Sequence, residues 1–189
     1  MATEPVPRLT EEDYLALDRA ANYKSEFVDG EMYAMSGGTL RHANLAFSIG
    51  AELWLQLKGR KCRVFNSDAR VRASEGKAYF YPDISVVCGE SKTHANSNDT
   101  LINPTVIVEV LSPSTSDYDH GKKFACYREI PTLQSYVLVH SDDILIEQFT
   151  RQPNGDWLLS EHRGIDASFA ISSIDCSISL RAIYEDAVE

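Results

Sequence analysis

The chain has 189 residues, of which 43% are hydrophobic and 24% charged, and this composition is typical of one globular domain spanning residues 1–189. Its 18 Lys and Arg against 28 Asp and Glu give a net charge of −10, which disfavours a protein that coats nucleic acid without sequence preference. No run approaches the roughly 18 apolar residues of a membrane span, and the segment before Leu9 lacks the apolar stretch of a signal peptide. We therefore expect a cytoplasmic protein without membrane contact, whose four separated cysteines are free thiols.

The N-terminal part of the sequence predicts a short helix, a β-hairpin and a long amphipathic helix. Thr10 opens the short helix as an N-cap, with Asp13 as the acid three residues later. Asp29-Gly30 is a two-residue turn signal, and Gly37-Gly38 interrupts the chain before the long helix. That helix has an apolar stripe at helical spacing, formed by Leu45, Ile49, Leu53 and Leu57. The expected bounds are 10–20 for the first helix, 25–28 and 31–35 for the hairpin, and 39–58 for the long helix.

The rest of the sequence predicts further strands with one long and one short helix. Runs of β-branched and aliphatic residues, bounded by turn residues, predict strands at 62–66, 69–73, 84–88 and 106–111. A helix at about 117–129 precedes a strand at 135–140, a hairpin of 144–149 with 157–162, and a terminal helix near 180–186. The polar segment 89–103 is expected to be a long loop. The order of elements predicts a mixed α/β fold, with additional β-hairpins in the N- and C-terminal parts.

One carboxylate stands in the middle of a strand that is otherwise apolar. The strand is VIVEVL, residues 106–111, and its acid is Glu109. Glutamate is almost never fully buried unless it is paired, because removing an unpaired carboxylate from water costs several kcal/mol. Asp83 enters the preceding predicted strand, and two neighbouring strands would bring both acids within reach of one Mg²⁺ ion. Alternatively, Asp83 only caps its strand and Glu109 pairs with a nearby Lys or Arg.

Longer motifs around these acids resemble a known family. The stretches are YPDISVV, VIVEVLSPST and DYDHGKKFACYREIPTLQSYVLV, with EFVDGEMYAMSGGTLRHANL upstream, and together they cover most of the chain. They resemble the Uma family of restriction endonuclease-like proteins, a bacterial branch of the PD-(D/E)XK nuclease superfamily. The resemblance implies a restriction-endonuclease-like core, with a mixed β-sheet flanked by helices, and metal-dependent hydrolysis of phosphodiester bonds. It agrees with Asp83 and Glu109 as ligands of Mg²⁺ or Mn²⁺.

The superfamily motif places a lysine two residues after the acid, where this chain has Leu111. The resemblance implies that this lysine has moved to the following helix, and the matching residue is Lys123, with Lys122 beside it. Asp119, Lys123 and Tyr127 are spaced four residues apart, so the ammonium can share a helix face with an acid that holds it. We therefore expect Lys123 to be catalytic and Lys122 to lie on the surface.

Further residues carry weaker signals. His42, at the start of the long helix, and Glu26, in the first hairpin, are expected to support the site; a satisfied helix-start histidine and a solvated acid are the alternatives. A basic cluster supplies candidate nucleic-acid contacts, with complementation of the helix dipole as the alternative: Lys58, Arg60, Lys61 and Arg63. The remaining histidines have no metal-ligand spacing and receive no role: His94, His120, His140 and His162.

These observations predict a Mg²⁺- or Mn²⁺-dependent endonuclease, with Asp83, Glu109 and Lys123 in catalysis, DNA as the expected substrate and a homodimer as the expected assembly. One alternative is a nuclease-like module without catalytic activity that binds nucleic acid or protein, favoured by Leu111 and the net charge of −10. Another is an unrelated β-rich interaction domain, in which Glu109 forms only a core ion pair. Metal binding separates the nuclease from the interaction domain, and cleavage separates it from the inactive module.

Overall fold

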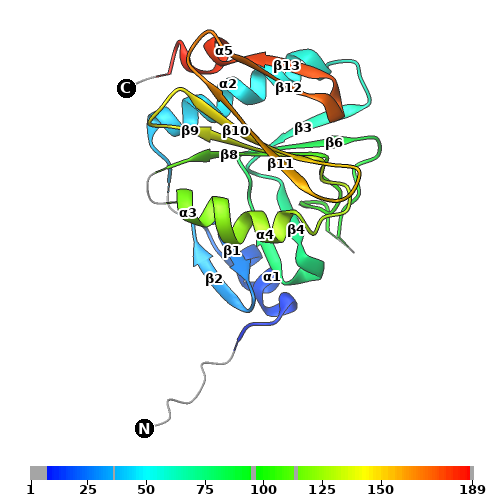
Figure 1. Cartoon of the computed structure of the whole chain (residues 1–189). Helices are drawn as coiled ribbons and strands as arrows, with labels where there is room; N and C mark the ends of the chain where they lie inside the picture. Colours follow the sequence, from blue (N-terminus) through cyan, green and yellow to red (C-terminus); the bar gives the residue numbers. More distant parts are fainter. Residues whose placement is uncertain (1–7, 36, 95–96, 113–114, 188–189) are drawn as a thin grey trace.

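The centre of the fold, taken from a computed structural model that describes residues 8–35, 37–94, 97–112 and 115–187, is a six-stranded mixed sheet (Figure 1). Its strand order is β11-β10-β9-β8-β6-β3. The strands are β3 (Cys62–Asn66), β6 (Ile84–Cys88), β8 (Val106–Leu111), β9 (Ser135–His140), β10 (Leu145–Arg151) and β11 (Trp157–Arg163). β8 and β9 run parallel, and the other neighbouring pairs run antiparallel.

A second sheet, with five strands, is built mostly from the N-terminal half of the chain and has the order β2-β1-β5-β4-β7. Its strands are β1 (Ser25–Val28), β2 (Glu31–Ala34), β4 (Arg70–Ala73), β5 (Ala78–Phe80) and β7 (Thr100–Leu101). Helix α1 (Glu11–Ala20) packs Tyr14 against Phe27 and Tyr79 of this sheet. The predicted Asp29-Gly30 turn is confirmed, because both residues have positive φ, 51° and 89°, as a tight two-residue hairpin requires.

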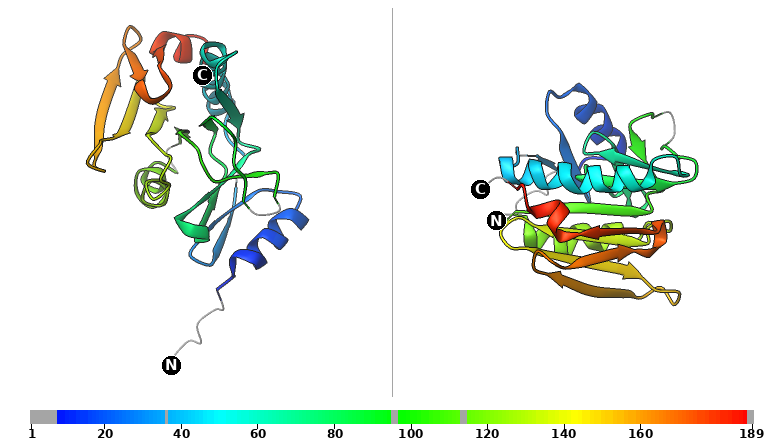
Figure 2. Two further views of the ribbon diagram at one scale, coloured as in Figure 1. Left: turned by 90° about the vertical axis from the view of Figure 1, so that its right-hand side faces the viewer. Right: turned by 90° about the horizontal axis from the view of Figure 1, so that it is seen from above.

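Helices lie on both faces of the central sheet (Figure 1 and Figure 2). One face carries α2 (Leu40–Leu57), α5 (Leu180–Tyr184) and the small sheet of β12 (Ser168–Ile171) and β13 (Cys176–Ser179). The other face carries α3 (Ser116–Tyr118), η2 (Asp119–Lys123) and α4 (Phe124–Tyr127), with the N-terminal sheet beyond. The amphipathic stripe of α2 is confirmed, since its predicted apolar residues are all buried: Leu45, Ile49, Leu53 and Leu57.

Strand β8 separates two hydrophobic clusters. Val106, Val108 and Val110 belong to the cluster under α2, whereas Ile107 and Leu111 belong to the cluster shared with α4 and the N-terminal sheet. Side chains alternate between the two faces of a strand, so the acid at position 109 shares the second face with Ile107 and Leu111. The central carboxylate of this strand therefore faces the helical segment that follows β8.

Some elements differ from the sequence prediction. The helix expected at 117–129 contains a π-helical turn, η2, between α3 and α4. The Tyr136 hydroxyl of β9 donates to the Asp119 carbonyl oxygen at 3.1 Å, which gives this oxygen a partner outside the helix where the regular hydrogen-bond pattern is interrupted. The sequence does not predict β5, β7, β12 or β13, because two to four residues carry little periodicity. β7 lies inside the segment 89–103 that was expected to be a loop.

The expectation of four free thiols is wrong for two of the cysteines. Cys62 and Cys88 form a disulfide between β3 and β6, whereas Cys126 and Cys176 are free. The antiparallel register places Cys62 directly opposite Cys88, so their Cβ atoms adjoin on one face of the sheet. The two residues are 26 positions apart in sequence, and no local cysteine spacing reveals the contact. In the described part of the chain, no helix is both long enough and apolar enough to cross a membrane.

Candidate active site

Asp83 and Glu109 lie side by side on neighbouring strands. β6 and β8 pair antiparallel with Ile84 opposite Val108, which brings Asp83, the residue before β6, next to Glu109. The Asp83 backbone N–H donates to Glu109 Oε2 at 3.4 Å, and the Val110 N–H donates to Asp83 Oδ2 at 2.8 Å. The structure thus brings together the two acids that the sequence analysis proposed as metal ligands.

The ammonium of Lys123 lies among three carboxylates. Its Nζ is 3.0 Å from Glu109 Oε1, 2.9 Å from Glu26 Oε1 and 3.3 Å from Asp119 Oδ1. Asp119 and Lys123 are one helical turn apart in η2, and Glu26 comes from β1. Because Lys123 is only 7% exposed, water screens these ion pairs weakly. The structure therefore also brings the proposed catalytic lysine and one supporting acid, Glu26, to Glu109.

Glu109 is held by a third group, since the Tyr127 hydroxyl of α4 donates to its Oε1 at 2.9 Å. Burial raises the pKa of Glu109 to about 8, although the ammonium of Lys123 pulls in the opposite direction. Burial likewise raises the pKa of Glu26. Burial alone would lower the pKa of Lys123, but the three carboxylates hold it well above its ordinary value of 10.5. Lys123 is therefore charged, and three carboxylates share its single positive charge.

The site has more acid than one lysine can balance. Glu26, Asp83, Glu109 and Asp119 carry four negative charges when ionised, and Lys123 carries one positive charge, so the formal sum is −4 + 1 = −3. Carboxylate oxygens are the preferred ligands of hard divalent cations such as Mg²⁺ and Mn²⁺. The donor set at Asp83 and Glu109 therefore fits such an ion, and a bound cation would reduce the charge excess.

His42 reaches the site from the first turn of α2. Thr39 caps this helix and accepts the His42 N–H at 3.1 Å, while His42 Nε2 lies 3.3 Å from Asp83 Oδ2. This contact with Asp83 raises the pKa of His42 above its ordinary 6.5, against the opposing effect of burial. Gly50 allows α2 to approach β6 closely, because a Cβ at that position would lie 2.7 Å from Ile84 Cδ1. The second supporting residue of the sequence analysis thus contacts one of the proposed ligands.

The basic cluster lies at the other end of α2. Lys58 follows the last residue of this helix and His42 lies in its first turn, so about 24 Å of helix separates them. Arg60 donates to the carbonyls of Ile174 and Asp175 at 2.8 and 3.1 Å, and Lys58 Nζ lies 4.9 Å from the centroid of the Trp54 ring. The structure therefore does not bring the predicted nucleic-acid contacts to the carboxylates: Lys58, Arg60 and Lys61.

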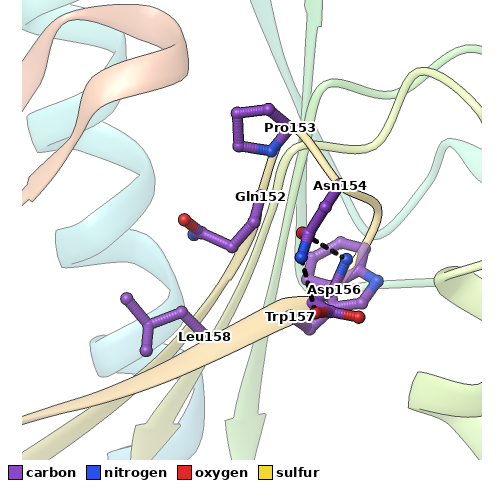
Figure 3. Close-up of a pocket in the computed structure, with 6 residues that line it drawn as sticks. All are labelled: Gln152, Pro153, Asn154, Asp156, Trp157 and Leu158. Carbon is purple, nitrogen blue, oxygen red and sulfur yellow. Dashed lines mark hydrogen bonds between the residues drawn. The ribbon is translucent and has the colours of Figure 1, made fainter.

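A surface hollow of about 480 Å³ lies at the turn between β10 and β11 (Figure 3), lined by Gln152, Pro153, Asn154, Asp156, Trp157 and Leu158. Asn154 Nδ2 donates to Asp156 Oδ2 at 2.7 Å, and Asn154 Oδ1 accepts the Asp156 N–H at 3.1 Å, so both side chains stabilise the turn itself. The pairing of Thr150 with Ser135 puts this turn near the start of β9, whereas Glu109 lies towards the opposite end of the parallel strand β8. The hollow is therefore separate from the candidate site.

Sequence analysis missed a cluster of His120, His140 and Glu147, in which both histidines contact one carboxylate oxygen. These residues come from η2, β9 and β10 and have no regular spacing. The role of Tyr127 was missed as well, although its spacing from Lys123 places both on one helix face. That spacing could have indicated the contact with Glu109.

A solved structure with a similar fold is that of an Anabaena variabilis protein, described as "a putative nuclease". It matches with a TM-score of 0.78 at 20% sequence identity, and the match covers 95% of this chain and 99% of that chain. The mixed sheet flanked by helices thus places the protein in the mixed α/β class, with the same fold as that structure. The expectation of a mixed α/β fold of this kind is confirmed.

Sequence comparisons identify the family to which the chain belongs. Residues 11–177 match the Uma2 model, described as "Putative restriction endonuclease". Two uncharacterized proteins of Synechocystis sp. are 34% identical over 180 residues and 37% identical over 164 residues. These matches cover 95% and 87% of this chain, and 93% of each relative. The chain belongs to the Uma2 family, which confirms the resemblance found in the motifs and excludes an unrelated interaction domain.

Proposed function

We propose that the protein is a metal-dependent endonuclease that hydrolyses phosphodiester bonds of nucleic acid, with Mg²⁺ or Mn²⁺ as its cofactor and DNA as its substrate. The observation that carries the proposal is the contact of Asp83 with Glu109 on neighbouring strands, with Lys123 Nζ 3.0 Å from Glu109. Membership of the Uma2 family and the nuclease-like fold support a nucleic-acid substrate.

Asp83 and Glu109 would hold the metal ion, which when bound polarises a phosphoryl oxygen and neutralises negative charge. Tyr127 orients Glu109 through a hydrogen bond of 2.9 Å, and the Val110 N–H orients Asp83 at 2.8 Å. His42, 3.3 Å from Asp83, is placed to donate a hydrogen bond at the same edge of the sheet. The backbone and side-chain contacts thus fix both carboxylates before substrate arrives.

Lys123 would take the role of the lysine that the superfamily motif places at position 111. Leu111 shares the face of Glu109 but is 3% exposed in an apolar cluster, and its side chain has no polar atom with which to orient water. Lys123 reaches Glu109 from the helix instead, where its ammonium stabilises negative charge that develops on the phosphate and positions the attacking water. Glu26 and Asp119 keep this ammonium charged and in place.

The test measures cleavage and metal binding in the same variants. Lys123→Met should lower the cleavage rate by about 10² or more, the usual effect of losing one electrostatic or proton-handling group, and should not weaken Mn²⁺ binding. Asp83→Asn combined with Glu109→Gln should abolish both. Lys122→Met is the matched control, because Lys122 is exposed and its Nζ lies over the Tyr33 ring at 5.9 Å. A fully active Lys123→Met protein would contradict the proposed role of this lysine.

A second candidate is a nuclease-like module without catalytic activity. It is favoured because the ammonium of Lys123 already has three carboxylate partners. Its Nζ contacts them at 3.3 Å or less, and the residue is only 7% exposed. An ion-pair network of this kind can be purely structural. A protein that is inert towards DNA and RNA and shows no response to Mg²⁺ or Mn²⁺ would decide for this module.

We also propose that the protein acts as a homodimer. Leu40, Phe47 and Trp54 are 80%, 74% and 50% exposed and recur every seven residues along one face of α2. An apolar stripe of this kind marks an interaction surface, and a second copy of the same helix offers a matching one. Light scattering after sizing chromatography should give the mass of a dimer for the wild type and of a monomer for Phe47→Glu. A monomeric wild type at micromolar concentration would contradict this assembly.

We place the protein in the cytoplasm, as the sequence led us to expect. Disulfides rarely persist in that compartment, so the bond between Cys62 and Cys88 makes the protein an exception there. The antiparallel pairing of β3 with β6 holds the two residues together in either redox state.

A further inference from the structure

A separate group of metal-binding side chains converges beyond the candidate active site. His120 lies in η2, His140 is the last residue of β9, and Glu147 lies in β10. His120 Nε2 and His140 Nε2 lie 2.6 and 2.7 Å from the same atom, Glu147 Oε2. One donor atom from each of the three residues lies within 4.8 Å of the other two. The three side chains therefore point at one location from three different elements.

The orientation of His120 is fixed by its other ring nitrogen. Nδ1 lies 2.7 Å from the Ser116 carbonyl oxygen, which can only accept a hydrogen bond, so Nδ1 carries a proton. In the neutral ring, Nε2 then has a free lone pair that points at Glu147. Histidines that ligate metals are commonly oriented in this way, by donating the second ring N–H to a backbone carbonyl.

The contact between His120 and Glu147 requires a positive charge. A free imidazole nitrogen and a carboxylate oxygen are both acceptors, and at 2.6 Å they repel unless a proton or a metal ion joins them. Among the described residues, the ion-pair partners found for Glu147 are His120 and His140, and neither is a lysine or arginine with a permanent charge. The cluster therefore binds either a proton or another cation at its centre.

We propose that His120, His140 and Glu147 form a binding site for Zn²⁺, separate from the pair of Asp83 and Glu109. Two imidazoles and one carboxylate are a ligand set that Zn²⁺ accepts at about 2.0–2.2 Å, whereas Mg²⁺ takes mainly oxygen ligands. Tetrahedral ligands at these lengths lie about 3.3 Å apart, so the two contacts with Glu147 would each lengthen by about 0.6 Å, and the donor atoms of the two histidines already lie within 4.8 Å of each other. Side-chain exposures of 31%, 25% and 12% give the ion access from solvent.

A Zn²⁺ ion at this place would fasten the helical segment to the central sheet. His120 belongs to the same π-helical turn as Asp119 and Lys123, whereas His140 and Glu147 belong to β9 and β10. A bond across these elements restrains the turn that positions the Lys123 ammonium. The ion thus has a positioning role, and its binding does not depend on the proposed nuclease activity.

Calorimetric titration with Zn²⁺ tests the site directly, in a background of Asp83→Asn with Glu109→Gln that removes the other candidate ligands. We expect one Zn²⁺ per chain in this background. His140→Gln and Glu147→Gln, each added singly, should weaken binding by more than about tenfold, because each removes a direct ligand. His94→Gln is the matched control, because His94 also faces a carboxylate, Glu11 at 3.5 Å, and should bind Zn²⁺ as the background does.

The thermal response to Zn²⁺ provides a second readout in the same variants. Zn²⁺ should raise the melting temperature of the background and of His94→Gln, and this rise should be lost in His140→Gln and Glu147→Gln, whose own melting curves show that they are folded. Three results would overturn the proposal: no Zn²⁺ binding by the wild type, equal binding after His140→Gln and Glu147→Gln, or loss of binding in the background alone.

Discussion

Replacement of Lys123 by methionine tests whether its buried ammonium holds the acids of the site together. Methionine keeps most of the length and volume of the side chain but removes the charge. Glu26, Glu109 and Asp119, at 2.9, 3.0 and 3.3 Å from Nζ, would lose their common counter-ion. Removal of one partner from a buried ion pair typically destabilises a protein by about 3–5 kcal/mol. We expect a loss of this size in the free energy of unfolding at pH 8 without metal.

The loss should be smaller in acid. Burial raises the pKa of Glu109 to about 8, so this carboxyl gains its proton as the pH falls from 8 towards 5 and needs a counter-ion less; burial also raises the pKa of Glu26, which acts in the same direction. A carboxyl group whose pKa is raised by folding stabilises the folded state at low pH. For Glu109 this stabilisation is complete below pH 4.5 and is lost as the pH rises through about 8. The raised pKa of Lys123 acts differently: its contribution is complete below 10.5 and is lost only in stronger base. We expect the penalty at pH 5 to be less than about half of that at pH 8.

Urea unfolding followed by far-ultraviolet circular dichroism at pH 5 and pH 8, with a chelator present, measures both quantities. Lys122→Met is the control, and as an exposed substitution it should change stability by no more than about 0.5 kcal/mol. The reasoning is refuted if Lys123→Met loses less than about 1 kcal/mol at pH 8, or if its losses at the two pH values are equal.

Three further predictions follow from other contacts. Asp18→Asn should destabilise the protein by about 3–5 kcal/mol in urea unfolding, because Asp18 pairs at 2.6 Å with Arg70, which is 1% exposed; the exposed pair of Lys24 and Asp68 provides the control, and a comparable loss in Asp68→Asn would contradict this view. Millimolar Mn²⁺ should raise the melting temperature of the wild type, by an amount equivalent to about 2.7 kcal/mol at 100 times the dissociation constant. That increment should vanish in Asp83→Asn with Glu109→Gln, and an equal increment there would place the metal elsewhere. Alkylation of a rapidly quenched cell extract, followed by mass spectrometry, should recover Cys62 and Cys88 as a disulfide-linked pair; modification of both as free thiols would contradict the bond between β3 and β6.

Local patterns predicted most of the fold because they reflect contacts that repeat along one element. The stripe of α2 and the apolar run of β8 report burial against the core, and both elements formed close to the expected bounds. The prediction that Asp83 and Glu109 are adjacent assumed only that two consecutive long strands pair, and β6 and β8 do pair. Helical spacing and the family resemblance together predicted the position of Lys123, and the structure places its Nζ against Glu109.

The remaining features depend on register or on single long-range contacts. The disulfide of Cys62 with Cys88 follows from the exact pairing of β3 with β6, which no local pattern specifies. The cluster at Glu147 joins residues of three elements, and the π-helical turn contains the Asp119 carbonyl oxygen that accepts the long-range hydrogen bond from Tyr136. The basic cluster was visible in the sequence, but its distance from the acids depends on the length and direction of α2.

We propose that Asp83, Glu109 and Lys123 form the site of a metal-dependent nuclease. The most direct measurement is the initial rate at which purified protein cleaves supercoiled DNA in Mn²⁺ or Mg²⁺, compared between the wild type, Glu109→Gln and Lys123→Met, each verified as folded. We predict cleavage by the wild type that a chelator abolishes, and rates lower by about 10² or more in both variants. Wild-type protein that leaves DNA intact with either metal, or variants that cleave as fast as the wild type, would contradict this site.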